Sequence, residues 1–175
     1  MTSQNDSESM WSFVTLRTKS ACNSTEFSKH FLIGALLRLA QQSEYGPGEI
    51  SLKEFIEEFF VTSGLDQNEE KMLFVVLDDQ RHVTGFLQAR SLFETADLDF
   101  VVVEHRQRGK GLGGQLLRRF ESELRGRGVL RVMLEVASGN KDALHLYLKT
   151  GYKKISVRKS YYRTGEDALV MEKVL

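Results

Sequence analysis

The glycines of residues 109–114, GKGLGG, have the spacing of a phosphate-binding loop. They fit G-x-G-x-x-G, the pattern with which dinucleotide-binding folds hold a pyrophosphate at the N-terminus of a helix. Glu135 follows at about the position where such folds place the acid that binds a ribose. Glycines let consecutive backbone N–H groups turn towards one centre, and the dipole of the following helix adds positive charge there. The sequence therefore predicts an anion site, and the neighbouring segments indicate which phosphate ligand it holds.

Three features of the chain argue against a dinucleotide. In the dinucleotide fold the first glycine follows its strand almost directly, whereas here the segment EHRQR separates Val103 from Gly109. That fold also needs several βαβ units, but the segments before this loop have the pattern of an antiparallel hairpin. About 40 residues follow Glu135, too few to complete the usual sheet. We therefore favour a different phosphate ligand.

The first part of the chain predicts one strand and two helices. Residues 11–18, WSFVTLRT, are a candidate strand, and YGPG, with the only proline, breaks the chain between the helices. Each helix has a candidate capping box, Asn23 with Glu26 for the first and Ser51 with Glu54 for the second. Apolar residues at helical spacing follow the two boxes: Phe27, Phe31, Leu32, Leu36 and Leu39, then Leu52, Phe55, Ile56, Phe59 and Phe60.

Strand and helix patterns alternate through the rest of the chain. A hairpin, a third strand, an amphipathic helix, a short apolar strand, a shorter helix and two final strands are expected. Their residues are 71–77, 82–93, 97–103, 112–124, 129–136, 140–150, 152–159 and 167–175. The order β-αα-βββ-α-β-α-ββ predicts a single α/β domain with a mixed central sheet over residues 11–175. Residues 1–10 are polar, and we expect them to form a disordered tail.

Composition excludes several classes of protein. A chain of 175 residues that is 41% hydrophobic is long enough for one domain with a core. Lys+Arg and Asp+Glu both total 24, so we expect no nucleic-acid and no membrane partner. The single cysteine, Cys22, excludes an intramolecular disulfide, and the histidines show no metal-like pairing, so we expect no metal. A secretory signal and an apolar run of ~20 residues are both missing, so we expect a cytoplasmic protein.

The glycine loop also fits R/Q-x-x-G-x-G/A, with Arg108, Gly111 and Gly113 at the defined positions. This is the loop of the GNAT N-acetyltransferases, and the chain resembles that superfamily from residue 11 to its end. The resemblance implies the GNAT fold, with helices on both faces of the mixed sheet, and acetyl-CoA as the co-substrate. In that family the loop holds the pyrophosphate of coenzyme A, the preceding strand pairs its backbone with the pantetheine arm, and an asparagine that opens a later helix contacts CoA. The residues carried over to acetyl-CoA are Val101, Val102, Val103, Arg108, Gly109, Lys110, Gly111, Leu112, Gly113, Gly114 and Asn140.

The C-terminal third narrows the resemblance. It contains L-E-V at Glu135, L-Y-x-x-x-G-Y at Tyr147 and Y-Y…E-D-A from Tyr161. These segments are similar to those of the bacterial ribosomal-protein-alanine N-acetyltransferases and of other protein N-terminal acetyltransferases. The resemblance implies that the acceptor is the α-amino group of a protein N-terminus or peptide and that it attacks acetyl-CoA directly in a ternary complex. It also implies that residues 43–49 and 160–166 flank the peptide, with Tyr161 and Tyr162 hydrogen-bonded to its backbone.

The implied catalytic residues suit this chemistry. A protein α-amine has a pKa of about 8, so a carboxylate can remove its proton near neutral pH, and Glu135 matches the position of that base. The departing thiolate has a conjugate-acid pKa of roughly 8.5, and a tyrosine, whose pKa is about 10, can protonate it. Tyr147 matches the position of that acid.

Each of these residues also has a simpler interpretation. Glu135 suits a surface charge, Tyr147 a core aromatic residue, Asn140 a helix cap, and Tyr161 with Tyr162 a packed hairpin. The alternatives for the whole chain are an enzyme of the same fold that acetylates a small amine, such as a polyamine, amino acid or aminoglycoside, and a non-catalytic CoA-binding module. The first half of the chain departs from the bacterial enzymes, which leaves a ribosomal substrate open.

Overall fold

The computed structural model describes residues 11–17, 27–59 and 69–175. The predicted tail (residues 1–10), Cys22, the proposed capping pair Asn23 and Glu26, and Phe60 lie outside the described residues. The elements are β1 (Ser12–Arg17), α1 (Lys29–Ala40), α2 (Glu49–Glu58), β2 (Glu69–Leu77), β3 (Val83–Leu92), β4 (Thr95–Val103), η1 (His105–Gln107), α3 (Leu112–Arg125), β5 (Arg131–Ala137), α4 (Lys141–Lys149), β6 (Lys153–Arg158) and β7 (Ala168–Val174). This order confirms the predicted β-αα-βββ-α-β-α-ββ.

The strands form one mixed sheet in the order β1-β2-β3-β4-β5-β7-β6. The predicted hairpin is confirmed, since β2 and β3 pair antiparallel, with Phe74 opposite Leu87. The pairing of β4 with β5 is parallel and crosses over through α3, while the other neighbouring strands are antiparallel. None of the helices in the described ranges is long and apolar enough to cross a membrane.

Two of the helix starts differ from the sequence prediction. The N-cap of α1 is Ser28, whose hydroxyl accepts a hydrogen bond from the N–H of Phe31. The predicted capping box of α2 at Ser51 and Glu54 is wrong, because the helix already begins after Gly48 and both residues lie inside it. Glu49, rather than a polar cap, places a negative charge at the positive end of the helix dipole.

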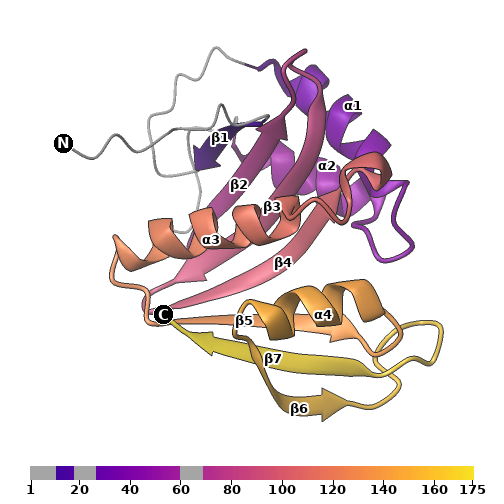
Figure 1. Cartoon of the computed structure of the whole chain (residues 1–175), viewed down its shortest axis with the longest axis vertical. Coiled ribbons are helices and arrows are strands. Elements are labelled where there is room, and N and C mark those ends of the chain that lie inside the picture. The colour runs from indigo at the N-terminus through magenta and orange to yellow at the C-terminus, as the bar shows by residue number, and fades with distance from the viewer. Residues whose placement is uncertain (1–10, 18–26, 60–68) are drawn as a thin grey trace.

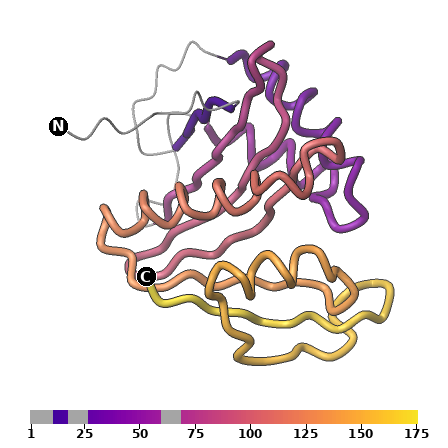
Figure 2. Tube along the Cα trace, viewed as in Figure 1, coloured from indigo at the N-terminus to yellow at the C-terminus, as the bar shows by residue number. Residues whose placement is uncertain are grey.

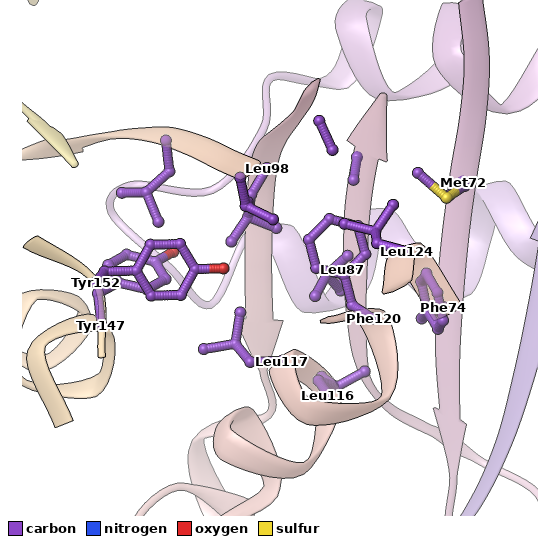
Figure 3. Packing of buried hydrophobic residues seen from close by; sticks show 14 of the residues in the cluster. Met72, Phe74, Leu87, Leu98, Leu116, Leu117, Phe120, Leu124, Tyr147 and Tyr152 are labelled. Carbon is purple, nitrogen blue, oxygen red and sulfur yellow. The ribbon is translucent and has the colours of Figure 1, made fainter. Parts of the chain in front are cut away.

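Helices cover both faces of the sheet, as predicted (Figure 1). One apolar cluster joins α3 and α4 to the sheet through residues that include Phe74, Leu87, Phe120 and Tyr147 (Figure 3). The other joins α1 and α2 to the opposite face through residues that include Leu36 and Ile56. Because neighbouring residues of a strand point to opposite faces, β2, β3 and β4 contribute alternately to the two clusters.

The sheet opens between β4 and β5. Their Cα register runs from Thr95 opposite Arg131 to Leu98 opposite Leu134, and in the described residues of these strands it goes no further. At this point a register shift inserts Asp99 as an extra residue in β4, opposite the step from Gln88 to Ala89. Such a bulge bends a strand. Each strand keeps its other neighbour, so β4 continues beside β3 and β5 beside β7, and a gap forms between them (Figure 1).

Candidate active site

A cleft of about 740 Å³ lies at the gap between β4 and β5. The end of β4, the glycine loop, the start of α4 and the loop after α1 line it. Ten of the residues predicted from the sequence line it, namely Val101, Val102, Val103, Arg108, Gly109, Gly111, Leu112, Gly113, Asn140 and Tyr147. Five others are absent from the lining formed by described residues: Lys110, Gly114, Glu135, Tyr161 and Tyr162.

The end of β4 directs backbone groups into the gap. The N–H of Glu104 donates to the carbonyl of Thr84 at 2.8 Å, so Glu104 faces β3. Backbone groups of successive residues alternate in direction, so Val102 faces β3 as well, whereas Val101 and Val103 face the gap. An extended ligand arm can therefore pair with the N–H and C=O groups of Val101 and with the N–H of Val103, as an added strand would. The carbonyl of Val103 already accepts from the side chain of Arg108.

The glycine loop ends in an exposed helix N-terminus. Gly109 and Gly111 have φ angles of +74° and +85°, a left-handed conformation that favours glycine. Gly111 is the N-cap of α3, and no described side chain caps the helix. The first N–H groups of a helix have no partner within it. Those of α3 therefore remain available to an anion beside the cleft, and the helix dipole favours negative charge there.

The remaining loop residues divide into packing and polar contacts. A Cβ at Gly113 would lie 3.1 Å from Leu146 of α4, so this glycine allows α3 and α4 to approach closely. Gly114 is buried within α3. The Nζ of Lys110 lies 3.0 Å from the Oε1 of Gln107, at the rim of the loop.

Arg108 holds the loop in place. Its Nε donates to the carbonyl of Val103 at 3.1 Å, and its guanidinium also donates to the carbonyl of Gln42 at 3.3 Å. The side chain of Gln42 accepts in turn from the N–H of His105 at 3.2 Å. Gln42 follows the last turn of α1 and lines the cleft. No local sequence pattern indicates a role for Gln42, because its partners are more than sixty residues away along the chain.

The helix α4 brings Asn140 and Tyr147 to the cleft. Asn140 is the N-cap, and its side-chain oxygen accepts from the N–H of Ala143 at 3.2 Å. Tyr147 is 7% exposed and packs edge to face on Tyr152, with ring centroids 5.6 Å apart. Burial raises the pKa of the Tyr147 hydroxyl above its ordinary value of 10.0, and Tyr162 adds to the rise. The phenol therefore stays protonated and able to donate through the physiological pH range.

Glu135 lies on the opposite face of the sheet from α4. Its neighbours Leu134 and Val136 point into the cluster below α3 and α4, so the side chain of Glu135 points the other way. There its Oε1 is 2.9 Å from the Nε of Arg158 on β6. A hydrogen bond to Glu135 raises the pKa of Tyr161, which places that hydroxyl beside the carboxylate.

Tyr161 and Tyr162 both lie near Glu135. Their rings meet edge to face at 5.3 Å. Burial raises the pKa of Tyr162, and the charge of Glu135 is its next largest cause. Since Tyr162 also raises the pKa of Tyr147, its hydroxyl is close enough to interact with residues on both sides of the gap. Tyr161 and Tyr162 can therefore pack the hairpin loop and also contact a ligand.

Three loops meet at the open end of the gap. The N–H of Gly139, in the loop after β5, donates to the carboxylate of Glu166, in the loop between β6 and β7. A Cβ at Gly139 would lie 3.1 Å from the hydroxyl of Tyr45, in the loop between α1 and α2. Figure 2 shows the loop of Tyr45 and the loop of Glu166 at the same end of the molecule. The sequence indicated both loops, but not that Tyr45 and Glu166 meet.

Comparison with known proteins agrees with this geometry. Residues 35–152 match the acetyltransferase (GNAT) family. The chain is 31% identical over 105 residues to the ribosomal protein bS18-alanine N-acetyltransferase of Salmonella typhimurium, which covers 58% of this chain and 71% of that protein. The crystal structure of the ribosomal-protein-S18-alanine N-acetyltransferase from Escherichia coli has a TM-score of 0.71 at 21% identity, over 94% of both chains. Ard1 from Thermoplasma volcanium has a TM-score of 0.73 at 21% identity, over 95% of this chain and 98% of that one. The two solved structures share the fold, and the family match covers more than half of the sequence; this chain belongs to the acetyltransferase (GNAT) family.

Proposed function

We propose that this acetyl-CoA-dependent N-acetyltransferase transfers the acetyl group to the α-amino group of a protein N-terminus, by direct attack in a ternary complex. One observation carries the proposal. A cleft with an anion site lies on the α3–α4 side of the gap, and a carboxylate with two tyrosines lies on the other face of β5. The two groups are near each other, because the charge of Glu135 raises the pKa of Tyr162 and Tyr162 in turn raises the pKa of Tyr147.

The cleft fits acetyl-CoA. Its N–H groups at the start of α3 suit a pyrophosphate, and the glycines at 109 and 111 leave the backbone uncovered there. The backbone of Val101 and Val103 suits the amide-bearing pantetheine arm. An N–H group of this strand edge would also stabilise the negative charge that develops on the thioester oxygen during attack.

In this proposal Glu135 and Tyr147 move the two protons of the reaction. Glu135 removes a proton from the acceptor ammonium, and the neutral nitrogen then forms a bond to the acetyl carbon as the carbon–sulfur bond breaks. Tyr147 donates its proton to the departing thiolate. Its raised pKa keeps the proton in place until the thiolate forms. The acetylated nitrogen then loses its second proton to water, and the phenolate takes up a proton from water, which restores Tyr147.

The choice of a protein N-terminus rests on the acceptor side. Tyr161 is 48% exposed beside Glu135, so its hydroxyl and ring are accessible to a ligand. The loops of Tyr45 and Glu166 approach each other over the same end of the gap, where an extended chain would pass. The relative from Salmonella typhimurium carries a name that specifies acetylation of the alanine of a ribosomal protein, which is support from similarity.

The test is a comparison of acceptor classes. Wild-type protein with acetyl-CoA is given peptides that differ in their first residue, the same peptides with blocked α-amines, and a panel of polyamines, amino acids and aminoglycosides. Release of CoA is followed by thiol titration, and mass spectrometry locates the acetyl group. We expect turnover with free N-terminal peptides, acetylation at the α-nitrogen, and no turnover with the blocked peptides. Faster turnover of a small amine than of every peptide would identify a small-amine acetyltransferase instead, and CoA binding without any turnover would identify a non-catalytic module.

A further inference from the structure

Glu135 is already paired with a cation in this structure. Arg158 extends from β6, across the intervening strand β7, and places its Nε 2.9 Å from the Oε1 of Glu135. The guanidinium also lies 5.4 Å from the centroid of the Tyr161 ring. The Glu135 carboxylate also raises the pKa of Tyr161, which places the two side chains next to each other. The guanidinium is therefore held by the same two side chains that form the acceptor side of the site.

The acceptor amine needs the same carboxylate. At neutral pH an α-amine with a pKa of about 8 is mostly an ammonium ion, so it arrives as a cation and must lose a proton. An arginine side chain keeps its proton under these conditions. It can therefore neutralise the carboxylate but cannot take part in the proton transfer. The acceptor ammonium is the reactant, whereas the Arg158 guanidinium can only occupy its place beside Glu135.

The ion pair is also easy to open. The Arg158 side chain is 57% exposed and that of Glu135 is 28% exposed, so water can solvate both groups after they separate. Pairs with this exposure are weak because solvent screens them and because the long side chain loses freedom when it is held. Asp97, Tyr161 and Tyr162 also interact with Glu135, and none of these three is a cation.

We propose that the Arg158 guanidinium occupies the place of the acceptor ammonium at Glu135 when the acceptor site is empty, and that the acceptor must displace it. Arg158 is then a positioning residue that competes with the substrate. This inference rests on the proposed role of Glu135 in acetyl transfer. It predicts that removal of the guanidinium improves acceptor binding, which is the opposite of what loss of a supporting contact would do.

The first experiment separates the two Michaelis constants. Arg158→Gln removes the charge, Arg158→Lys keeps a cation, and Lys154→Gln removes an exposed cation elsewhere on β6 as a matched control. Steady-state rates are measured with the amine that wild-type protein acetylates best. For Arg158→Gln we expect the acceptor KM to fall about 2- to 5-fold, the range for pairs of this exposure, with the acetyl-CoA KM unchanged. Arg158→Lys should lie between wild type and Arg158→Gln, and Lys154→Gln should match wild type.

The second experiment asks whether the effect depends on Glu135. Calorimetry measures acceptor binding to the protein saturated with CoA, where no turnover occurs. Arg158→Gln should tighten acceptor binding by a similar factor in the wild-type background and should have no effect in a Glu135→Gln background. Thermal unfolding of every variant checks that the fold is retained.

The outcomes distinguish this inference from the proposed function. An unchanged or higher acceptor KM in a folded Arg158→Gln protein overturns the competition, as does an effect that persists in the Glu135→Gln background. The KM comparison works for any accepted amine. If the substrate is a small amine and Arg158→Gln lowers its KM, the N-terminal function is overturned and the competition is supported. If the substrate is a peptide and Arg158→Gln leaves its KM unchanged, the N-terminal function is supported and the competition is overturned.

Discussion

The two sides of the gap between β4 and β5 build their sites from different parts of the polypeptide. In the proposed function, the donor side binds its ligand through backbone atoms, namely the strand edge at Val101 and Val103 and the N–H groups at the start of α3. The acceptor side uses side chains: Glu135 on β5 lies beside Arg158 of β6 and beside two tyrosines of the loop between β6 and β7. A short stretch of sequence makes the first site, whereas distant segments must meet to make the second.

This difference determines which substitutions each side tolerates. A backbone site depends on conformation, so an added Cβ at a left-handed glycine damages it, while many changes of charge nearby do not. A side-chain site depends on individual functional groups, so an isosteric change of one atom damages it while the fold stays intact. The predictions below use substitutions that separate these two kinds of dependence.

The largest effect is expected on the acceptor side, for Glu135→Gln. This change preserves size and removes the proton acceptor, so kcat should fall roughly 10²–10⁴-fold, the range for a positioned acid or base. The acetyl-CoA KM should barely change, because Glu135 lies on the other face of β5. Higher pH should restore part of the rate, since more of the amine is then neutral, its pKa being about 8.

A control for Glu135→Gln lies on the adjacent strand. Glu172 on β7 forms an ion pair with Arg131 at 3.6 Å, two rows away from Glu135 in the sheet. Glu172→Gln should leave kcat near the wild-type value. Near-native turnover of Glu135→Gln at pH 7 would show that another group or water takes the proton.

The donor side should respond most to Gly111→Val. At φ +85° a β-branched residue is strained, which costs about 1–3 kcal/mol and disfavours the loop conformation that presents the N–H groups. If that cost falls on the binding-competent loop, the acetyl-CoA affinity drops by about 5- to 150-fold. The acceptor KM should stay within about 2-fold of wild type, because substitutions at distant sites usually act independently.

Gly128→Val is a matched control for this strain. Gly128 has a φ of +76° and open space around its Cβ position, but it lies in the turn after α3, away from the cleft. It should lower thermal stability and leave acetyl-CoA affinity, measured by calorimetry, unchanged. Equal loss of affinity in both variants would mean that general destabilisation, and not the anion site, explains the effect of Gly111→Val.

Tyr147→Phe should have a smaller effect than either change. It removes the proton donor, but a thiolate is a fair leaving group, so kcat should fall only roughly 10-fold, below the usual range for acid–base groups. The loss should shrink with an acetyl thioester whose thiol has a lower pKa and needs less protonation. Tyr152→Phe removes the hydroxyl of the neighbouring buried ring and should leave kcat unchanged. A loss for Tyr147→Phe that is the same with every thioester would assign Tyr147 to packing alone.

The same contrast explains how much of the molecule was predictable. Local periodicity predicted the element order, and the strand end with its glycine loop predicted most of the sequence-based residues that line the cleft, because both patterns depend on residues close in sequence. The predicted start of α2 was wrong because Ser51 and Glu54 have the spacing of a capping box, whereas the helix begins earlier, with Gly48 as its N-cap. The bulge at Asp99, the Gln42 contacts and the Arg158–Glu135 pair depend on tertiary structure, so no local pattern indicates them.

The smallest expected effect concerns the place where the two sides meet. Glu166 accepts from the N–H of Gly139, a residue that lines the donor cleft, and its charge also raises the pKa of Tyr45 after the larger effect of burial. Glu166→Gln keeps an acceptor oxygen but loses the charge, and hydrogen bonds to charged groups are stronger than neutral ones. Because the contact is exposed, we expect only about a 2- to 3-fold rise in the acceptor KM and a smaller rise in the acetyl-CoA KM.

A double-mutant cycle with Tyr45→Phe measures whether the two residues act together. Additive effects, or an acetyl-CoA KM that changes more than the acceptor KM, would show that Glu166 belongs to the donor side and would shift the boundary between the two sites.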